Sequence, residues 1–138
     1  MRIFVDTGAW LAVNDRDDRW HHAAVRFLTE ITGEATLFYT TDYIIDETVT
    51  LIRFRVSQRR ATAFLDSLPL NQNLIYAVVR ERLLDKGEDI FRKYSDKKWS
   101  FTDCVSFAFM DEIGLMDVFG FDSNFRQYGK VLHPGRGA

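Results

Sequence analysis

The sequence predicts an α/β fold in which a parallel sheet of four to five strands is covered by helices on both faces. Short runs rich in β-branched and aromatic residues alternate with longer segments whose apolar residues recur at helical spacing. Parallel strands joined through helices need crossover connections, which are almost always right-handed. The 138 residues suit one domain, because two domains of half that length would bury too little surface.

The predicted strands are short and mostly apolar. We expect strands over residues 2–5, 37–40, 73–79 and 116–121, with 131–132 as a short edge strand. The run from Asn73 to Val79 contains both β-branched and aromatic residues, which fit a pleated, half-buried surface. The order of these strands along the chain is firmer than their boundaries.

The predicted helices lie between the strands and are bounded by start and stop signals. We expect helices over residues 8–13, 20–31, 43–55, 57–68, 80–94 and 101–113. Gly33 is a plausible stop, Ser57 a good N-cap, and Pro69 ends the helix that Ser57 begins. Gly87 is a point at which the helix over 80–94 can be interrupted. The segment 101–113 is almost continuously apolar, so we expect its helix to be central.

The composition is that of an ordinary globular protein, with 46% hydrophobic and 28% charged residues. A formal net charge of −2 gives no overall attraction to nucleic acid, so any such binding needs a local patch. No apolar run approaches the roughly 20 residues of a membrane-spanning helix, and the single cysteine, Cys104, forms no internal disulfide. We expect a cytoplasmic protein with its domain over residues 1–133 and a loose tail over 134–138.

Four acidic residues stand where apolar segments meet helix starts or buried helices: Asp6, Glu47, Asp103 and Asp122. Asp6 and Asp122 directly follow predicted strands, and the carboxyl ends of strands are where open parallel sheets assemble their sites. If the carboxylates converge, protonation or a divalent cation can relieve their repulsion. A cation held there would supply metal-dependent chemistry on phosphates.

Each acid also has a local explanation. Asp6 and Asp103 can cap helices, and Asp122 can stabilise a turn. Glu47 is harder to explain locally, because it lies close to the apolar face of its helix, where an unpaired carboxylate is costly. The combination of four acids at four element junctions favours a shared site.

Four segments resemble the motifs of PIN-domain ribonucleases and, more closely, of the VapC toxins of bacterial toxin–antitoxin pairs. Residues 5–10, Val-Asp-Thr-Gly-Ala-Trp, resemble the opening motif, and Asp46-Glu47-Thr48 followed by Leu51 resembles the second. Residues 99–108 resemble the third motif and residues 120–125 the fourth. Each motif is weak alone, but four in register over approximately residues 2–133 form a specific signal.

The resemblance implies a three-layer α/β/α PIN-like fold, one or two Mg²⁺ or Mn²⁺ ions, and endonucleolytic hydrolysis of RNA phosphodiesters. It further implies that the acids are catalytic and hold metal directly or through water, with hydroxyls in supporting roles. The residues so assigned are Asp6, Glu47, Asp103 and Asp122 as metal ligands and Thr7 and Thr102 as supporting residues. Hard oxygen donors suit Mg²⁺, whose bound water has a lowered pKa and can attack phosphorus. The implied partners are RNA, a cognate small antitoxin and a second copy of the chain.

The sequence departs from the family pattern at Asn124. Many members carry another acid two positions after the fourth-motif aspartate, where this chain has an amide. An amide can still ligate a metal or hydrogen-bond to its water, but it brings no charge. We therefore expect a weaker second metal site, with Asn124 in a supporting role.

RNA binding requires cations near the acids, because phosphate contacts dominate affinity for nucleic acid. Lys97, Lys98 and Trp99 lie shortly before Asp103, and Trp99 can either stack on an unpaired base or belong to the core. A second cluster over residues 53–60 contains four arginines, and clusters of this kind are more often solvated surface.

Two other classes of function remain as alternatives. One is an aspartate-based phosphatase with Asp6 as nucleophile, although families resembling the haloacid dehalogenases want an acid where Gly8 stands. The other is a non-catalytic PIN-like module that binds RNA or protein, which would be free to lose its acids. Cys104 lies in an apolar helix beside Asp103, an environment that disfavours a thiolate and favours a packing role.

Overall fold

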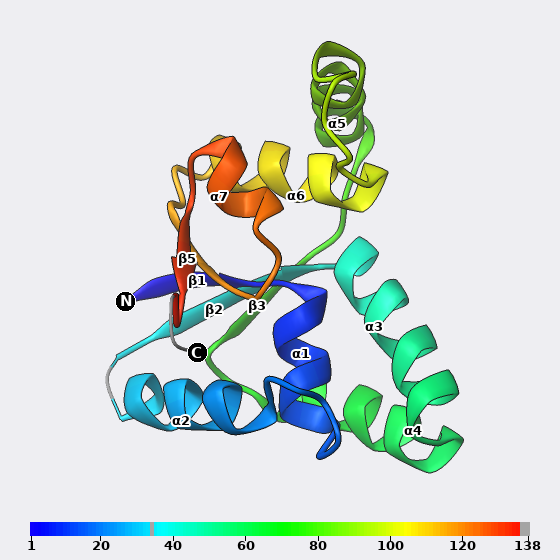
Figure 1. The fold of residues 1–138 in the computed structure, drawn as a ribbon, viewed down its shortest axis with the longest axis vertical. Helices are drawn as coiled ribbons and strands as arrows, with labels where there is room; N and C mark the ends of the chain where they lie inside the picture. Colours follow the sequence, from blue (N-terminus) through cyan, green and yellow to red (C-terminus); the bar gives the residue numbers. More distant parts are fainter. Residues whose placement is uncertain (34, 136–138) are drawn as a thin grey trace.

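A computed structural model describes residues 1–33 and 35–135, and it is a three-layer α/β/α fold built on one parallel sheet (Figure 1). The strands are β1 (Arg2–Val5), β2 (Leu37–Thr41), β3 (Leu74–Ala77), β4 (Asp117–Phe119) and β5 (Val131–His133). Their order in the sheet is β3-β2-β1-β4-β5, and every paired neighbour runs parallel. The predicted fold class is confirmed, including the short edge strand. The expected tail over 134–138 lies partly outside the described residues.

The helices are α1 (Thr7–Asn14), α2 (His21–Thr32), α3 (Asp42–Arg55), α4 (Gln58–Ser67), α5 (Glu81–Lys93), α6 (Phe101–Glu112) and α7 (Asn124–Tyr128). A 3-10 turn, η1 (Leu68–Leu70), follows α4 at the predicted proline stop. Ser57 is the N-cap of α4, as expected, because its hydroxyl accepts the Arg60 backbone N–H at 3.1 Å. None of the described helices is long and apolar enough to cross a membrane.

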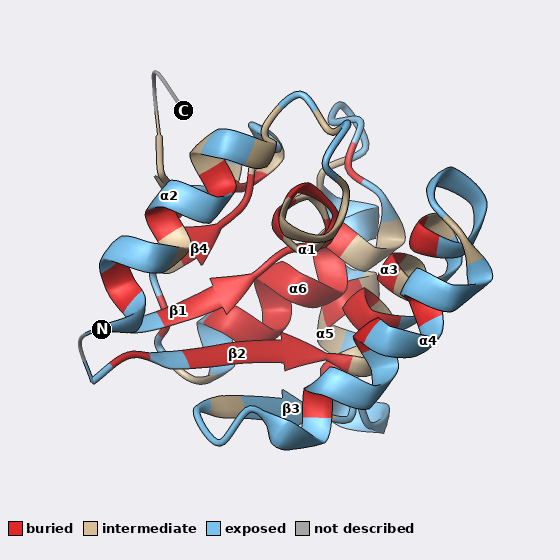
Figure 2. Ribbon diagram, turned by 90° about the horizontal axis from the view of Figure 1, so that it is seen from below, coloured by how far each residue is buried: buried red, intermediate tan, exposed pale blue. Residues whose placement is uncertain are grey.

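The side chains of β1 alternate between the two faces of the sheet and so divide the core between them. Figure 2 shows β1 as mostly buried, between α2 and α6. Ile3 and Val5 pack on the face covered by α1 and α2, where Phe27 belongs to the same cluster. Phe4 points to the other face and packs with the buried side of α6, including Phe107. Because both faces are buried, β1 is apolar at consecutive positions, as expected for a central parallel strand.

A third apolar cluster attaches α3 and α4 to α1. Leu11 of α1, Ile45 and Ile52 of α3, and Phe64 of α4 are all buried in it. This packing fixes the helix that carries Glu47 against the helix that follows Asp6. The order of elements predicted from sequence is thus confirmed, but the short α7 was not predicted, because five residues are too few to show a helical period.

The expected interruption at Gly87 is wrong, because α5 runs without a break from Glu81 to Lys93. Gly87 instead allows α5 to approach α6 closely. A Cβ at this position would lie 2.8 Å from Cγ2 of Val105 and 3.1 Å from its Cα. The glycine is therefore a packing requirement between the two helices.

We predict that Gly87→Ala destabilises the protein by about 1–3 kcal/mol, because the added methyl group overpacks the contact between α5 and α6. The melting temperature should fall by roughly 3–10 °C for a chain of this size. Gly33→Ala is the matched control, because no packing partner from elsewhere in the described chain lies within 4 Å of a Cβ at Gly33. Equal melting temperatures of the two variants in a calorimetric scan would contradict this account.

Candidate active site

The site lies where the chain changes direction across the sheet. From β1 the chain proceeds outward through β2 to β3, and it then returns to the other side of β1 to form β4 and β5. β1 and β4 are paired neighbours, and the crevice beyond the carboxyl ends of such a pair is the usual ligand site of an open α/β sheet. Asp6 follows β1 and Asp122 lies just beyond β4, so the topology places both carboxylates at this crevice.

Asp6 is held at this crevice by the neighbouring strand. Its backbone N–H donates to the Phe119 carbonyl at 2.9 Å, and its side chain is only 6% exposed. Gly120 makes room for it, since a Cβ at Gly120 would lie 3.1 Å from the Asp6 Cβ. No separate role for Gly120 was predicted, because its importance depends on the close approach of two strands that are distant along the chain.

The other three acids lie close enough to Asp6 for their charges to act on it. Burial is the largest cause that raises the pKa of Asp6 well above its ordinary value, followed by the charge of Asp103. The charges of Asp122 and Glu47 raise this pKa further, while a hydrogen bond from the Thr7 backbone opposes the shift. The local explanation of Asp6 as an N-cap holds for its backbone position only, because its side chain makes no capping hydrogen bond.

Asp103 is both a capping residue and a member of the cluster. Ser100 is the N-cap of α6, and the two residues form a reciprocal capping box in which Asp103 Oδ2 accepts the Ser100 backbone N–H at 3.1 Å. Burial raises the pKa of Asp103, and hydrogen bonds from Asn124 and Ser100 oppose that shift. Among the described residues, the hydrogen bonds to its carboxylate all reach Oδ2, so Oδ1 is available to a ligand.

Asn124 links two of the acids. Its amide Nδ2 donates to Asp103 Oδ2 at 3.0 Å and to Asp122 Oδ2 at 3.3 Å. Asp122 also accepts the Asn124 backbone N–H through Oδ1 at 2.9 Å, so the turn explanation of Asp122 is correct as well. The amide therefore offsets part of the carboxylate repulsion that an acid at this position would increase.

Glu47 is half-buried on α3 and lines an open hollow of about 640 Å³ that α3 shares with Thr102 of α6. Asp42 and Asp46 line the same hollow, although the sequence reading gave neither a role. The Asp42 carboxylate accepts the Val79 backbone N–H at 2.9 Å. Burial, together with the charges of Asp42 and Asp46, raises the pKa of Tyr76. In the sequence, the adjacent Asp46-Glu47 pair was the sign that further acids accompany Glu47 in this hollow.

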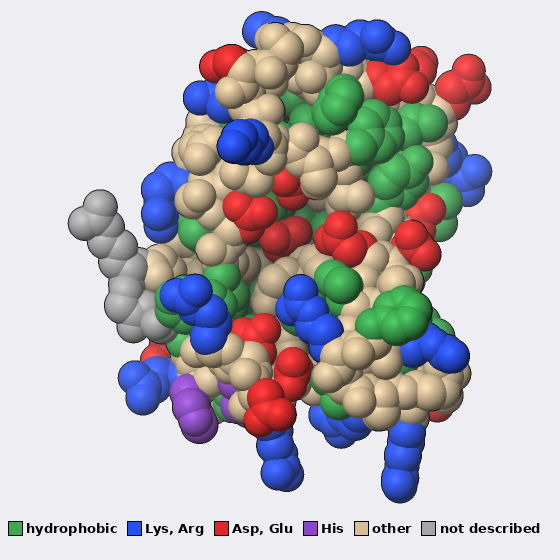
Figure 3. Space-filling view, turned by 45° about the vertical axis from the view of Figure 1, so that its right-hand side comes forward, with side chains coloured by type: hydrophobic (Ala, Val, Ile, Leu, Met, Phe, Trp, Pro, Cys, Tyr) green, Lys and Arg blue, Asp and Glu red, His purple; other side chains and the backbone are tan. Residues whose placement is uncertain are grey.

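The donor set fits a hydrated divalent ion better than a cage made of protein ligands alone. No group of three histidine, cysteine, aspartate or glutamate side chains, among residues 1–33 and 35–135, is arranged to hold a metal by itself. Mg²⁺ usually keeps several waters and is bound through one or two carboxylates. Thr7 Oγ1 is buried without a hydrogen-bond partner beside Asp6, as expected for a hydroxyl that completes a hydrated site. Figure 3 shows acidic side chains gathered across the middle of the face of the molecule that is drawn there.

The structure divides the predicted RNA-binding segment. Lys97 and Lys98 are exposed, but Trp99 is only 6% exposed, and its indole N–H donates to Gln127 Oε1 at 3.0 Å. The Trp99 ring packs against Phe107 with centroids 5.1 Å apart. The burial and packing of Trp99 agree with its core alternative and leave little of its ring exposed for stacking on an RNA base.

Cys104 has the packing role expected from sequence. It is 1% exposed, and burial followed by the charge of Asp103 raises the pKa of its thiol to about 11. A thiol with that pKa is almost fully protonated at neutral pH and is a poor nucleophile.

Residues 3–131 match the PIN domain, a match that covers most of the chain. The chain belongs to the PIN domain family. This agrees with the parallel sheet, the helices on both faces and the acidic crevice between β1 and β4.

Relatives of the chain include VapC proteins. It is 28% identical over 129 residues to the 23S rRNA-specific endonuclease VapC20 of Mycobacterium tuberculosis, covering 94% of this chain and 95% of VapC20. It is 26% identical over 142 residues to the VapC ribonuclease of Archaeoglobus fulgidus, covering 96% of this chain and 88% of that protein.

Solved structures agree with this relationship. The crystal structure of M. tuberculosis VapC20, described as a Sarcin-Ricin loop cleaving toxin, superposes with a TM-score of 0.85 at 28% identity over 94% of this chain and 96% of that one. VapBC2 from Rickettsia felis shares the fold, with a TM-score of 0.71 at 8% identity over 96% of this chain and 97% of that one.

We predict that Asp6→Asn stabilises the metal-free protein at neutral pH and flattens its pH dependence. Because the pKa of Asp6 is higher in the folded protein than in the unfolded chain, its contribution to stability is full below about pH 4 and is lost as pH rises through the folded-state pKa. The melting temperature of the native protein in EDTA should therefore fall as pH rises above about 4, through this contribution. Asp66→Asn on the exposed side of α4 is the control, and an equal pH dependence of native and Asp6→Asn proteins would contradict the assignment.

We predict that Asn124→Asp destabilises the metal-free protein by about 1–3 kcal/mol, because a donor to two carboxylates becomes a third negative charge. The same charge should increase the rise in melting temperature that millimolar Mn²⁺ produces. Asn124→Ala removes the amide without adding a charge and serves as the comparison. Equal responses of the two variants to Mn²⁺ would argue against a cation at this position.

Proposed function

We propose that this protein is an endoribonuclease that depends on Mg²⁺ or Mn²⁺ and acts as the toxin of a toxin–antitoxin pair. The observation that carries the proposal is the burial of Asp6 at the crevice between β1 and β4, within reach of the charges of Asp103, Asp122 and Glu47, while Asn124 bridges Asp103 and Asp122. Repulsion among carboxylates does not stabilise the fold, and a bound cation would relieve it. Clustered acids with a raised pKa are therefore typical of a functional site. The VapC relatives named as ribonucleases support RNA as the substrate.

The residues of the site would have different roles in phosphodiester hydrolysis. Asp6, Asp103, Glu47 and Asp122 would hold one or two ions, directly or through water, and Thr7 and Thr102 would offer hydroxyls to the same waters. The ion, when bound, supplies a water of lowered pKa and stabilises charge that develops on the phosphate. Asn124 would keep Asp103 and Asp122 in position through the two hydrogen bonds of its amide. The thiol of Cys104 takes no part in this scheme, because its raised pKa keeps it protonated.

Substrate and partners belong to the same proposal. VapC20 is named for 23S rRNA, so ribosomal RNA is the first substrate to test with this chain. A cognate small antitoxin would inhibit the toxin, and a guanidinium from such a partner could satisfy the clustered carboxylates as a cation does. We also propose a homodimer in the cytoplasm and a domain that ends near residue 133. Light scattering of the isolated protein tests the dimer, and co-expression with the neighbouring small reading frame tests the antitoxin.

We predict that Asp103→Asn and Glu47→Gln each lower the rate of RNA cleavage at least about 100-fold, because several kcal/mol of charge stabilisation depend on the ion. Total RNA with Mn²⁺, read by mapping of the cut ends, measures this loss, and EDTA should abolish cleavage by the native protein. Asp66→Asn is the matched control on the exposed face of α4. Native cleavage rates in both site variants, or full activity in EDTA, would overturn the metallonuclease proposal.

A further inference from the structure

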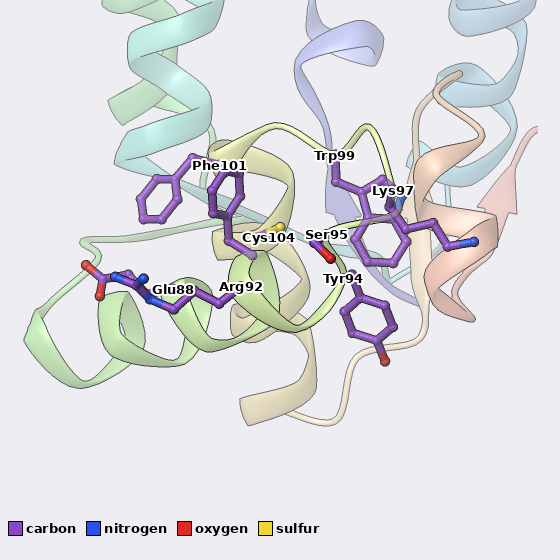
Figure 4. Close-up of a pocket in the computed structure, with 9 residues that line it drawn as sticks. Glu88, Arg92, Tyr94, Ser95, Lys97, Trp99, Phe101 and Cys104 are labelled. Carbon is purple, nitrogen blue, oxygen red and sulfur yellow. The ribbon is translucent and has the colours of Figure 1, made fainter.

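A second hollow, of about 580 Å³, lies beside the acidic site, between the C-terminal half of α5 and the first turn of α6 (Figure 4). Its lining is mostly aromatic, with Phe91 of α5 and Phe101 of α6, and it carries two cations, Arg92 and Lys97, and one acid, Glu88. Phe101 and Thr102 are consecutive, yet Phe101 lines this hollow and Thr102 lines the acidic one. The two hollows therefore meet at the turn of α6 that carries Asp103.

Aromatic rings connect the two hollows. The Tyr43 ring, which lines the acidic hollow, has its centroid 6.4 Å from that of Phe101. The Phe101 and Phe91 centroids are 5.8 Å apart, and the rings meet edge to face at 76°. A row of three rings thus leads from the acidic side chains into the second hollow. Aromatic rings in such a row can stack on the bases of a nucleotide chain that extends from the acidic hollow into the second hollow.

Phe91 and Trp99 both line the second hollow, but Phe91 is far more exposed. The Phe91 side chain is 48% exposed at the second hollow, whereas the Trp99 ring is packed into the core. An exposed phenylalanine in a hollow gains from being covered, because its apolar area then leaves water. The aromatic residue that can receive a base is therefore on α5, eight positions before the tryptophan indicated by the sequence.

The second hollow carries more positive than negative groups, with Arg92 and Lys97 against Glu88, whereas the charged groups of the acidic hollow are carboxylates. Arg92 and Lys97 both line it, and among the described residues the ion pair of Lys97 is a long one, with Asp96 at 4.0 Å between exposed groups. No ion pair among residues 1–33 and 35–135 involves Arg92. Cations flanking an aromatic surface match a nucleotide, in which an aromatic base adjoins an anionic phosphate.

We propose that the second hollow is a base pocket that holds an unpaired base of the RNA next to the phosphodiester that is cut. The base stacks on Phe91, with Phe101 at its edge, while Arg92 and Lys97 attract the adjoining phosphate. The proposal rests on the proposed ribonuclease function and adds to it the subsite that receives a neighbouring nucleotide. It also implies single-stranded substrate at this position, because a paired base cannot enter the pocket.

Substitutions at Phe91 test the base pocket. Phe91→Ala and Phe91→Leu should each raise the KM for a short single-stranded RNA, taken from the mapped cleavage site, about tenfold through loss of stacking, with kcat less affected. Phe91→Trp keeps a π-face and should retain native KM. Phe54→Ala is the matched control, because Phe54 is 77% exposed on α3 and lines neither hollow.

A second measurement detects stacking without turnover. In an Asp103→Asn background with Mn²⁺, the same RNA carrying 2-aminopurine beside the cleavage site should lose fluorescence on binding, and Phe91→Ala and Phe91→Leu should abolish that quenching. Native KM and quenching in Phe91→Ala would overturn the base pocket while leaving the nuclease intact. Native behaviour of Phe91→Leu alone would overturn it as well, because that result indicates apolar packing.

Two further outcomes distinguish the base pocket from a protein-docking surface and from failure of the proposed nuclease function. If Phe91→Ala cleaves and binds RNA normally but no longer retains the co-expressed small protein, the hollow is a protein-docking surface and the base pocket is wrong. If the native protein neither binds nor cuts RNA with Mn²⁺ present, the proposed function fails and the base pocket fails with it.

Discussion

Repulsion among carboxylates that are held out of water is the constraint on which the rest of this structure depends. Asp6 is 6% exposed, and three further acids act on it through their charges. An unfolded chain would separate these groups, so the apolar core must offset what their approach costs. That core is divided into clusters on the two faces of the sheet and around α3, and each cluster anchors an element that carries one of the acids.

Two kinds of contact keep the acids close enough to share a ligand. Small residues permit close approach, as Gly120 does for Asp6 and Gly87 does for α5 against α6. Polar groups reduce the repulsion that results, as the Asn124 amide does between Asp103 and Asp122. The first kind of contact is steric and the second electrostatic, and the site requires both, because neither packing nor hydrogen bonding alone fixes the positions of the carboxylates.

The fold and the acids could be predicted from sequence because both leave local signals. Alternating strand and helix patterns predicted the parallel sheet, and the position of Asp6 directly after a strand predicted its place at the sheet edge. Contacts between distant segments left no such signal. Gly87 resembles a helix breaker until Val105 is seen beside it, and Trp99 resembles an exposed aromatic beside lysines until Phe107 and Gln127 are seen to cover it.

The first turn of α6 places three consecutive side chains in different surroundings. Phe101 lines the second hollow, Thr102 lines the acidic hollow, and Asp103 accepts a hydrogen bond from Asn124. Consecutive residues of a helix point about 100° apart on one rigid backbone. Substrate preference and chemistry are therefore not separable within this turn, since a shift that accommodates a new group at Phe101 also moves the carboxylate two residues later. Substitutions in α5 can change the substrate preference without moving Asp103, because the side chains of α5 reach the second hollow from a different helix.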